Sequence, residues 1–145
     1  MEEQIITEQK QIKLSKESAE AVFNEFLDFY DIDFEDIVND QGKEGAKTLQ
    51  NKMIRAIQKG KVEIKMVEEN GGERLHVVQN LIGGDCVAYK EYNAAASMEA
   101  DKGRGGATAN YYLLASLCGH GVDRIKKLRG PDLKIAEYIG ILYQL

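Results

Sequence analysis

The last third of the chain, residues 110–145, constrains the fold most, because it reads as two apolar helices joined by a short basic linker. The first helix, 110–118, ends at Gly119, where glycine offers the left-handed backbone that terminates helices. The second opens at 130–132 as Gly-Pro-Asp. Proline suits a first helical turn that needs no N–H, and the aspartate complements the positive helix end. Both helices need partners to bury their side chains.

The closing helix carries more apolar surface than one neighbour normally covers. At 100° per residue its apolar side chains span an arc of roughly 220°, against roughly 100° for a helix with one buried face. We expect three residues at the centre of this arc to face the core and three on its flank to extend beyond it. The central residues are Ile135, Ile139 and Leu142, and the flanking residues are Tyr138, Ile141 and Leu145. Either the helix is buried on most sides, or the flank binds a partner protein or is covered by self-association.

Composition narrows the class of protein. A chain of 145 residues predicts a single domain, and 43% hydrophobic with 30% charged residues is typical of a soluble globular protein. A net charge of -5 argues against general nucleic-acid binding. No secretory leader is recognised at the start, and no apolar run approaches the length of a membrane span. Cys86 and Cys118 lack metal-ligand spacing, so we expect two reduced, packed thiols in a cytoplasmic protein without a cofactor.

The chain before the sheet is predicted to be mainly helical. Residues 4–14 alternate weakly and could form an edge strand. Ser15 then caps an amphipathic helix, a new helical start follows at Asp33, and 43–59 forms another helix that ends at Gly60. Ile32 and Ile37 stand at the positions of a hydrophobic staple around Asp33. The residues predicted to face inward are Ala19, Val22, Phe23, Phe26, Leu27 and Tyr30 in the first helix and Ala46, Leu49, Met53, Ala56 and Ile57 in the last.

A β-hairpin is predicted around Asn70-Gly71, because this dipeptide tolerates the positive φ angles of a type I′ turn. Its strands are 61–67 and 73–79, and 86–90 is a third strand after a glycine turn. The predicted register puts Met66 with Leu75 and Ile64 with Val77 on the buried face, and Lys65 with His76 on the solvent face. The predicted class is α+β: mostly helical, with a small antiparallel hairpin or meander between N-terminal and C-terminal helices.

Candidate chemistry is weak along the whole chain. A short helix is expected at 92–100. The glycine-rich stretch 103–106 that follows it fits a flexible joint better than a phosphate-binding loop. A calcium loop read from Asp31 fails, because its sixth and twelfth positions are Asp36 and Gly42. Cys118 and His120 could form a nucleophile and base, but burial at an apolar helix end should disfavour the thiolate, and His120 lies between two glycines with no evident orienting acid. We expect no catalytic, metal or cofactor site.

A basic patch stands out in an otherwise acidic protein. No aromatic residues alternate with it, so single-stranded nucleic-acid binding is poorly supported, and a solvated linker or a docking site for an acidic partner fits better. The patch comprises Arg124, Lys126, Lys127, Arg129 and Lys134.

The order of these pieces resembles the small tail assembly chaperones of tailed bacteriophages and prophages. The matching stretches are 21–26, 31–33, 55–64 before the hairpin, 88–92, 113–119, 125–128 and 132–133. The resemblance is one of layout and hydrophobic pattern over most of the chain. It implies a non-enzymatic viral protein of the host bacterial cytoplasm, which shields the apolar tape-measure protein and helps to recruit tail-tube subunits. The alternatives are a structural component of the phage tail or neck, and a thiol-dependent hydrolase that uses Cys118.

Overall fold

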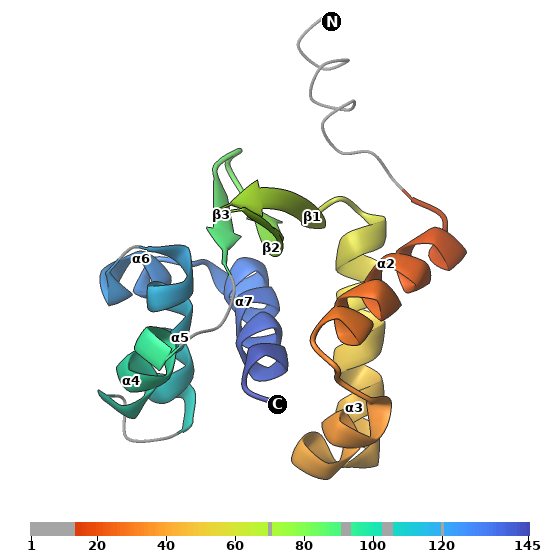
Figure 1. Ribbon diagram of the computed structural model, residues 1–145, viewed down its shortest axis with the longest axis horizontal. Helices are drawn as coiled ribbons and strands as arrows, with labels where there is room; N and C mark the ends of the chain where they lie inside the picture. Colours follow the sequence, from red (N-terminus) through yellow and green to blue (C-terminus); the bar gives the residue numbers. More distant parts are fainter. Residues whose placement is uncertain (1–13, 70, 91–93, 103–105, 120) are drawn as a thin grey trace, which may run out of the picture. The chain divides into compact units, whose positions relative to one another are not determined.

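The computed structural model describes residues 14–69, 71–90, 94–102, 106–119 and 121–145 (Figure 1). Its elements are α2 (Lys16–Phe29), α3 (Phe34–Gln58), β1 (Val62–Glu69), β2 (Gly72–Asn80), β3 (Cys86–Tyr89), α4 (Ala94–Lys102), α5 (Gly106–Cys118), α6 (Val122–Lys126) and α7 (Gly130–Tyr143). Helices predominate, and the strands form a small antiparallel sheet between N-terminal and C-terminal helices. The predicted α+β class is confirmed.

The chain divides into two compact units, Met1–Ile64 and Lys65–Leu145. The boundary falls inside β1, so this strand contributes to both units. The cooperative folding of the chain as one domain remains a prediction.

The first unit is built from α2 and α3, which pack against each other. The Ser15 hydroxyl accepts a hydrogen bond from the Ser18 N–H at 3.1 Å, which confirms the predicted N-cap. Ala19, Phe23, Phe26 and Leu27 are buried, as their spacing predicts. Val22 and Tyr30 are only half-buried, and the edge strand predicted over 4–14 lies almost wholly outside the described residues.

The two helical starts predicted at Asp33 and Lys43 belong to one long element, α3. At its beginning the Asp33 N–H donates to Asp36 Oδ2 at 2.9 Å. Gly42 departs from helical geometry, with φ 80° and ψ 166°, which separates the two segments inside α3. All five residues of 43–59 predicted to face inward are buried, and so are the staple residues Ile32 and Ile37. Gly60 follows the helix at φ 77°.

The sheet has the order β1-β2-β3, so β2 is its central strand. β1 ends at Glu69 and β2 begins at Gly72, as expected for a two-residue turn, and Gly71 has φ 78°. β2 and β3 pair antiparallel, with Val77 opposite Tyr89 and Asn80 opposite Cys86. The predicted third strand is therefore confirmed.

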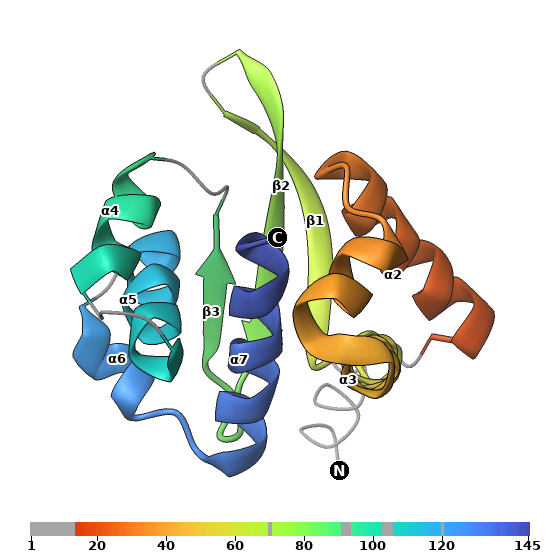
Figure 2. The ribbon, with the colours of Figure 1, turned by 90° about the horizontal axis from the view of Figure 1, so that it is seen from below.

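The predicted faces of the hairpin are wrong at Met66 and His76, whereas Lys65 is exposed as predicted and Ile64 is half-buried. Met66 is 50% exposed and His76 is buried, the reverse of the prediction, although Leu75 and Val77 are buried as expected. Leu75, His76 and Val77 are buried in succession, so both faces of β2 are covered at this point and alternation does not identify a solvent face. Figure 2 shows the turn end of the hairpin extending past α4, α5 and α7, which fits the exposure of Met66 four residues before the turn.

Candidate functional site

Helix α5 is the centre of the second unit, where it contacts α4, α6, α7 and β3. It begins at Gly106, four residues before its predicted start, and Leu113, Leu114 and Leu117 are buried along it. The Lys90 N–H donates to the Leu117 carbonyl at 3.0 Å, which fixes the end of α5 beside β3. The joint predicted at 103–106 lies outside the described residues except for Gly106, which opens the helix.

The linker between α5 and α7 is exposed at Lys126, Lys127 and Arg129, as predicted for a solvated linker, but it also contains the short helix α6. Ile125 of this helix is buried, and Arg124 Nη2 lies 2.6 Å from Asp85 Oδ2 in the turn between β2 and β3. These long-range contacts hold the segment against the rest of the second unit. Sequence spacing could not reveal them, because Asp85 and Arg124 are far apart in the chain.

Asp132 attaches the start of α7 to the sheet. Its carboxylate Oδ2 accepts from the Ile82 N–H at 2.9 Å, and its backbone carbonyl accepts from Gln79 Nε2 at 2.7 Å. Asp132 and Gln79 are both buried, so these bonds satisfy polar groups that have left water. The sequence suggested only an interaction of this acid with the helix dipole.

Tyr89 extends the same hydrogen-bond network. Its hydroxyl donates to Gln79 Oε1 at 2.9 Å, and the Tyr143 hydroxyl donates to the Tyr89 carbonyl at 3.5 Å. Burial, reinforced by the nearby Cys118, raises the pKa of the Tyr89 phenol well above its ordinary value of 10.0. α7 is therefore attached to β3 through Tyr143 and to β2 through Asp132.

A close approach between α5 and α7 fixes how α7 is rotated. A Cβ added at Gly140 would lie 1.7 Å from Asn110 Oδ1, so only glycine fits there beside this side chain. Asn110 Nδ2 donates to the Glu137 carbonyl at 3.1 Å, and its Oδ1 accepts from Gln144 Nε2 at 3.1 Å. The Tyr111 hydroxyl donates to Glu137 Oε2 at 3.0 Å, and this bond raises the pKa of Tyr111.

The predicted docking residues lie on the side of α7 away from these attachments. Tyr138 and Ile141 are half-buried and Leu145 is 38% exposed. We call these three residues the α7 flank. By contrast, Ile139 and Leu142 are buried, as predicted for the core side, whereas Ile135 is only half-buried. The helix ends at Tyr143 and not at Leu145, since Gln144 is its C-cap.

Lys134 continues the line of the α7 flank and was not predicted to belong to it. At 100° per residue, positions 134, 138 and 141 fall within about 60° of one another on a helix. Lys134 Nζ lies 5.8 Å from the centroid of the Tyr138 ring, a cation–π contact. The sequence feature that could have predicted this contact is a lysine four residues before a tyrosine, since side chains at that spacing are neighbours on a helix. The candidate surface is thus an apolar line with a cation at its N-terminal end.

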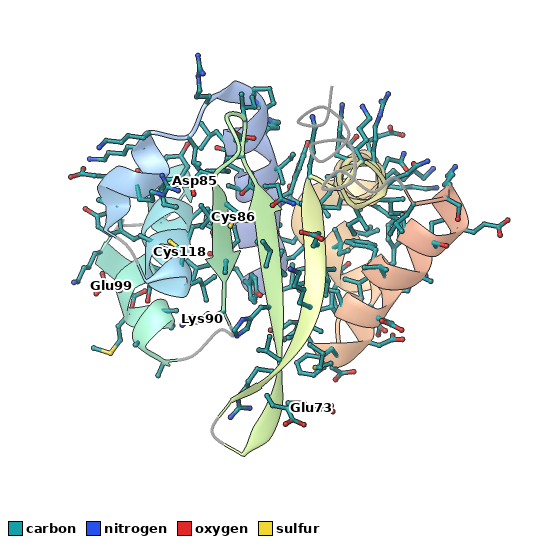
Figure 3. The ribbon with its side chains drawn as sticks, turned by 90° about the horizontal axis from the view of Figure 1, so that it is seen from above. Glu73, Asp85, Cys86, Lys90, Glu99 and Cys118 are labelled. Atoms are coloured by element: carbon teal, nitrogen blue, oxygen red, sulfur yellow. The ribbon has the colours of Figure 1, made fainter. Side chains whose placement is uncertain are left out.

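Of the thiols and histidines weighed as reactive groups, the structure describes Cys86, Cys118 and His76. Figure 3 shows Cys86 on β3 and Cys118 on α5. Cys86 is exposed, contrary to the predicted packed thiol, and Cys118 is half-buried with its Sγ donating to the Ala115 carbonyl at 3.5 Å. His120, the suggested base, lies outside the described residues. His76 is buried on the central strand.

Comparisons with known proteins add no identification. No protein-family model matches the chain, and neither curated proteins nor solved structures gave a match. Within the part of the chain that the structure describes, no group of three or more His, Cys, Asp or Glu side chains is placed to hold a metal ion. The described helices include none that is both long and apolar enough to cross a membrane.

Proposed function

We propose that this protein is a non-enzymatic tail assembly chaperone-like factor of a phage or prophage, acting through protein contacts in the host bacterial cytoplasm. The observation that carries the proposal is the α7 flank. Ile139 and Leu142 are buried on the core side of α7, whereas Tyr138 and Ile141 are half-buried and Leu145 is exposed. Apolar side chains left accessible along one helix side are typical of protein-binding surfaces.

The partner that fits this surface is an amphipathic helix. Residues spaced i, i+3 and i+7 form one line along a helix, the pattern by which helices and grooves recognise each other. Tyr138, Ile141 and Leu145 have this spacing. Under the proposal the partner is the tape-measure protein, whose apolar helices need cover before assembly, or the tail-tube protein.

Capture of purified tape-measure or tail-tube protein tests the proposal. Ile141→Ser with Leu145→Ser should weaken capture at least about tenfold, the effect of losing roughly 1.4 kcal/mol of binding free energy. The matched control is Ile82→Ser with Met98→Ser, which makes the same kind of change at two exposed apolar residues outside α7. Both double variants should melt close to the unchanged protein.

Two results would contradict the proposal. One is equal capture by the flank variant and its control. The other is a loss of stability in the flank variant as large as that of Ile139→Ala, which would mean that α7 is needed on all sides for folding. Mass spectrometry of purified phage particles addresses the alternative of a tail or neck component, because an assembly chaperone should be absent from them.

A further inference from the structure

Charge is distributed very unevenly along this chain. From Glu17 to Asp40 there are nine carboxylates and no lysine or arginine. All nine are exposed or half-exposed on α2, on the first part of α3 or on the turn between them. We call this stretch the acidic region. Within the part of the chain that the structure describes, none of its side chains is in an ion pair.

The basic patch of the second unit has the opposite character. Arg124 is paired with Asp85 at 2.6 Å, and Asp132 is buried with its carboxylate bonded to the Ile82 N–H. Asp123 is 4.0 Å from Lys126, a distance at which an exposed pair adds little. Lys127 and Arg129 are exposed, and among the described residues neither forms an ion pair. The patch therefore keeps an excess of positive charge on its surface.

We propose that the basic patch of one molecule docks on the acidic region of a second copy. Each surface repels itself, and contact between copies replaces like-charge repulsion by attraction. Every copy carries both surfaces, so the contact joins two different surfaces and leaves one of each free at the ends of the assembly. Association of this kind can extend beyond a dimer. Lys127 and Arg129 of the patch precede α7, so association through them can fail while partner capture through the α7 flank persists.

Salt dependence gives the first test. Sedimentation equilibrium over a range of protein concentrations should show a mass that rises with concentration at low salt. Raising NaCl from about 0.1 M to about 1 M shortens the Debye length from about 10 Å to about 3 Å and should weaken association at least about tenfold. A monomer at every concentration in low salt would overturn the proposal, and so would association that is unchanged at high salt. Salt-dependent compaction of a monomer would instead mean that the patch meets its own chain, which also overturns it.

Charge reversal gives the second test. Lys127→Glu with Arg129→Glu should weaken association at least about tenfold, while Lys47→Glu with Lys52→Glu, the same charge change at exposed positions of α3, should have little effect. Glu25→Lys with Asp28→Lys should weaken association from the acidic side. A mixture of the two defective proteins should associate again, because each retains the surface that the other has lost.

The charge-reversal results also discriminate between partners. An equal loss in the Lys47 and Lys52 control would show that only net charge matters and would overturn the contact. Failure of the two charge-reversed proteins to associate when mixed would also overturn the proposed contact. Tight binding of a short oligonucleotide to a protein that does not self-associate would assign the patch to a polyanion instead.

Discussion

Helices α2 and α7 are both 14 residues long, but they differ in how clearly their sequences mark the buried side. In α2 the polar side chains Asn24 and Asp28 mark the outer side, so the inner side follows directly. α7 is apolar around most of its circumference, and its orientation is set by contacts with Asn110, Gln79 and Tyr89. The spacing of hydrophobic residues predicts which side of a helix is buried only where polar residues identify the exposed side.

The largest effects are expected in the two cores. Phe23→Ala in α2 should cost about 3–5 kcal/mol of unfolding free energy, and Ile139→Ala in α7 about 2–5 kcal/mol, because each empties a fully packed site. Denaturant unfolding measures both losses. Calorimetry then tests the single-domain prediction: one shared transition should shift in both variants, whereas two transitions that respond separately would contradict it.

A smaller but more specific effect is expected at Gly140. Gly140→Ala should cost about 1–3 kcal/mol, because its Cβ displaces the Asn110 side chain and breaks its hydrogen bonds. Gly130→Ala is the matched control on the same helix, since a Cβ there meets nothing within 4 Å. Circular dichroism melts compare the two. Similar stability of the two variants would mean that this close approach does not orient α7.

Tyr89 provides a test that depends on pH. Its raised pKa means that the folded protein holds the phenol proton more tightly than the unfolded chain, which releases it near pH 10.0. The contribution of the Tyr89 phenol to the free energy of unfolding is therefore fully present below that pH and declines as the pH rises above it. Tyr89→Phe should cost about 1–3 kcal/mol at neutral pH, by leaving Gln79 without its donor, and should reduce the alkaline decline.

Tyr112→Phe is the control for that experiment, because it removes a half-exposed hydroxyl of the same unit. Denaturant unfolding at several pH values between neutral and strongly alkaline gives the comparison. If Tyr89→Phe retained the full alkaline decline and Tyr112→Phe lost it, the assignment of the decline to Tyr89 would be wrong.

The smallest effect is expected at Met66 on the hairpin. Met66→Asp should change stability by no more than about 0.5 kcal/mol, because this side chain is half exposed. Leu75→Asp, on the buried central strand, should destabilise the protein strongly by burying an unpaired charge. Thermal melts that reversed this order would support the hairpin faces predicted from sequence alternation.

Local signals in the sequence determined where most elements begin and end. Ser15 starts α2, Gly60 follows α3, and Pro131 lies in the first turn of α7, as predicted. These signals are readable because each acts on backbone groups within a few residues of itself. The turn of the hairpin, the third strand and the α+β class follow from the same kind of short-range information.

Only the tertiary structure decided which sides of these elements are buried. His76 is buried although the hairpin alternation predicts it exposed, and a Cβ at Gly140 would displace the Asn110 side chain. Asp132 binds a backbone N–H of a turn fifty residues earlier in the chain. Burial depends on partners that arrive from distant segments, and a single sequence with ambiguous apolar patterning does not specify those partners. The sequence already separated the α7 flank from the core residues Ile139 and Leu142, but only the fold showed that Ile135 is half-buried.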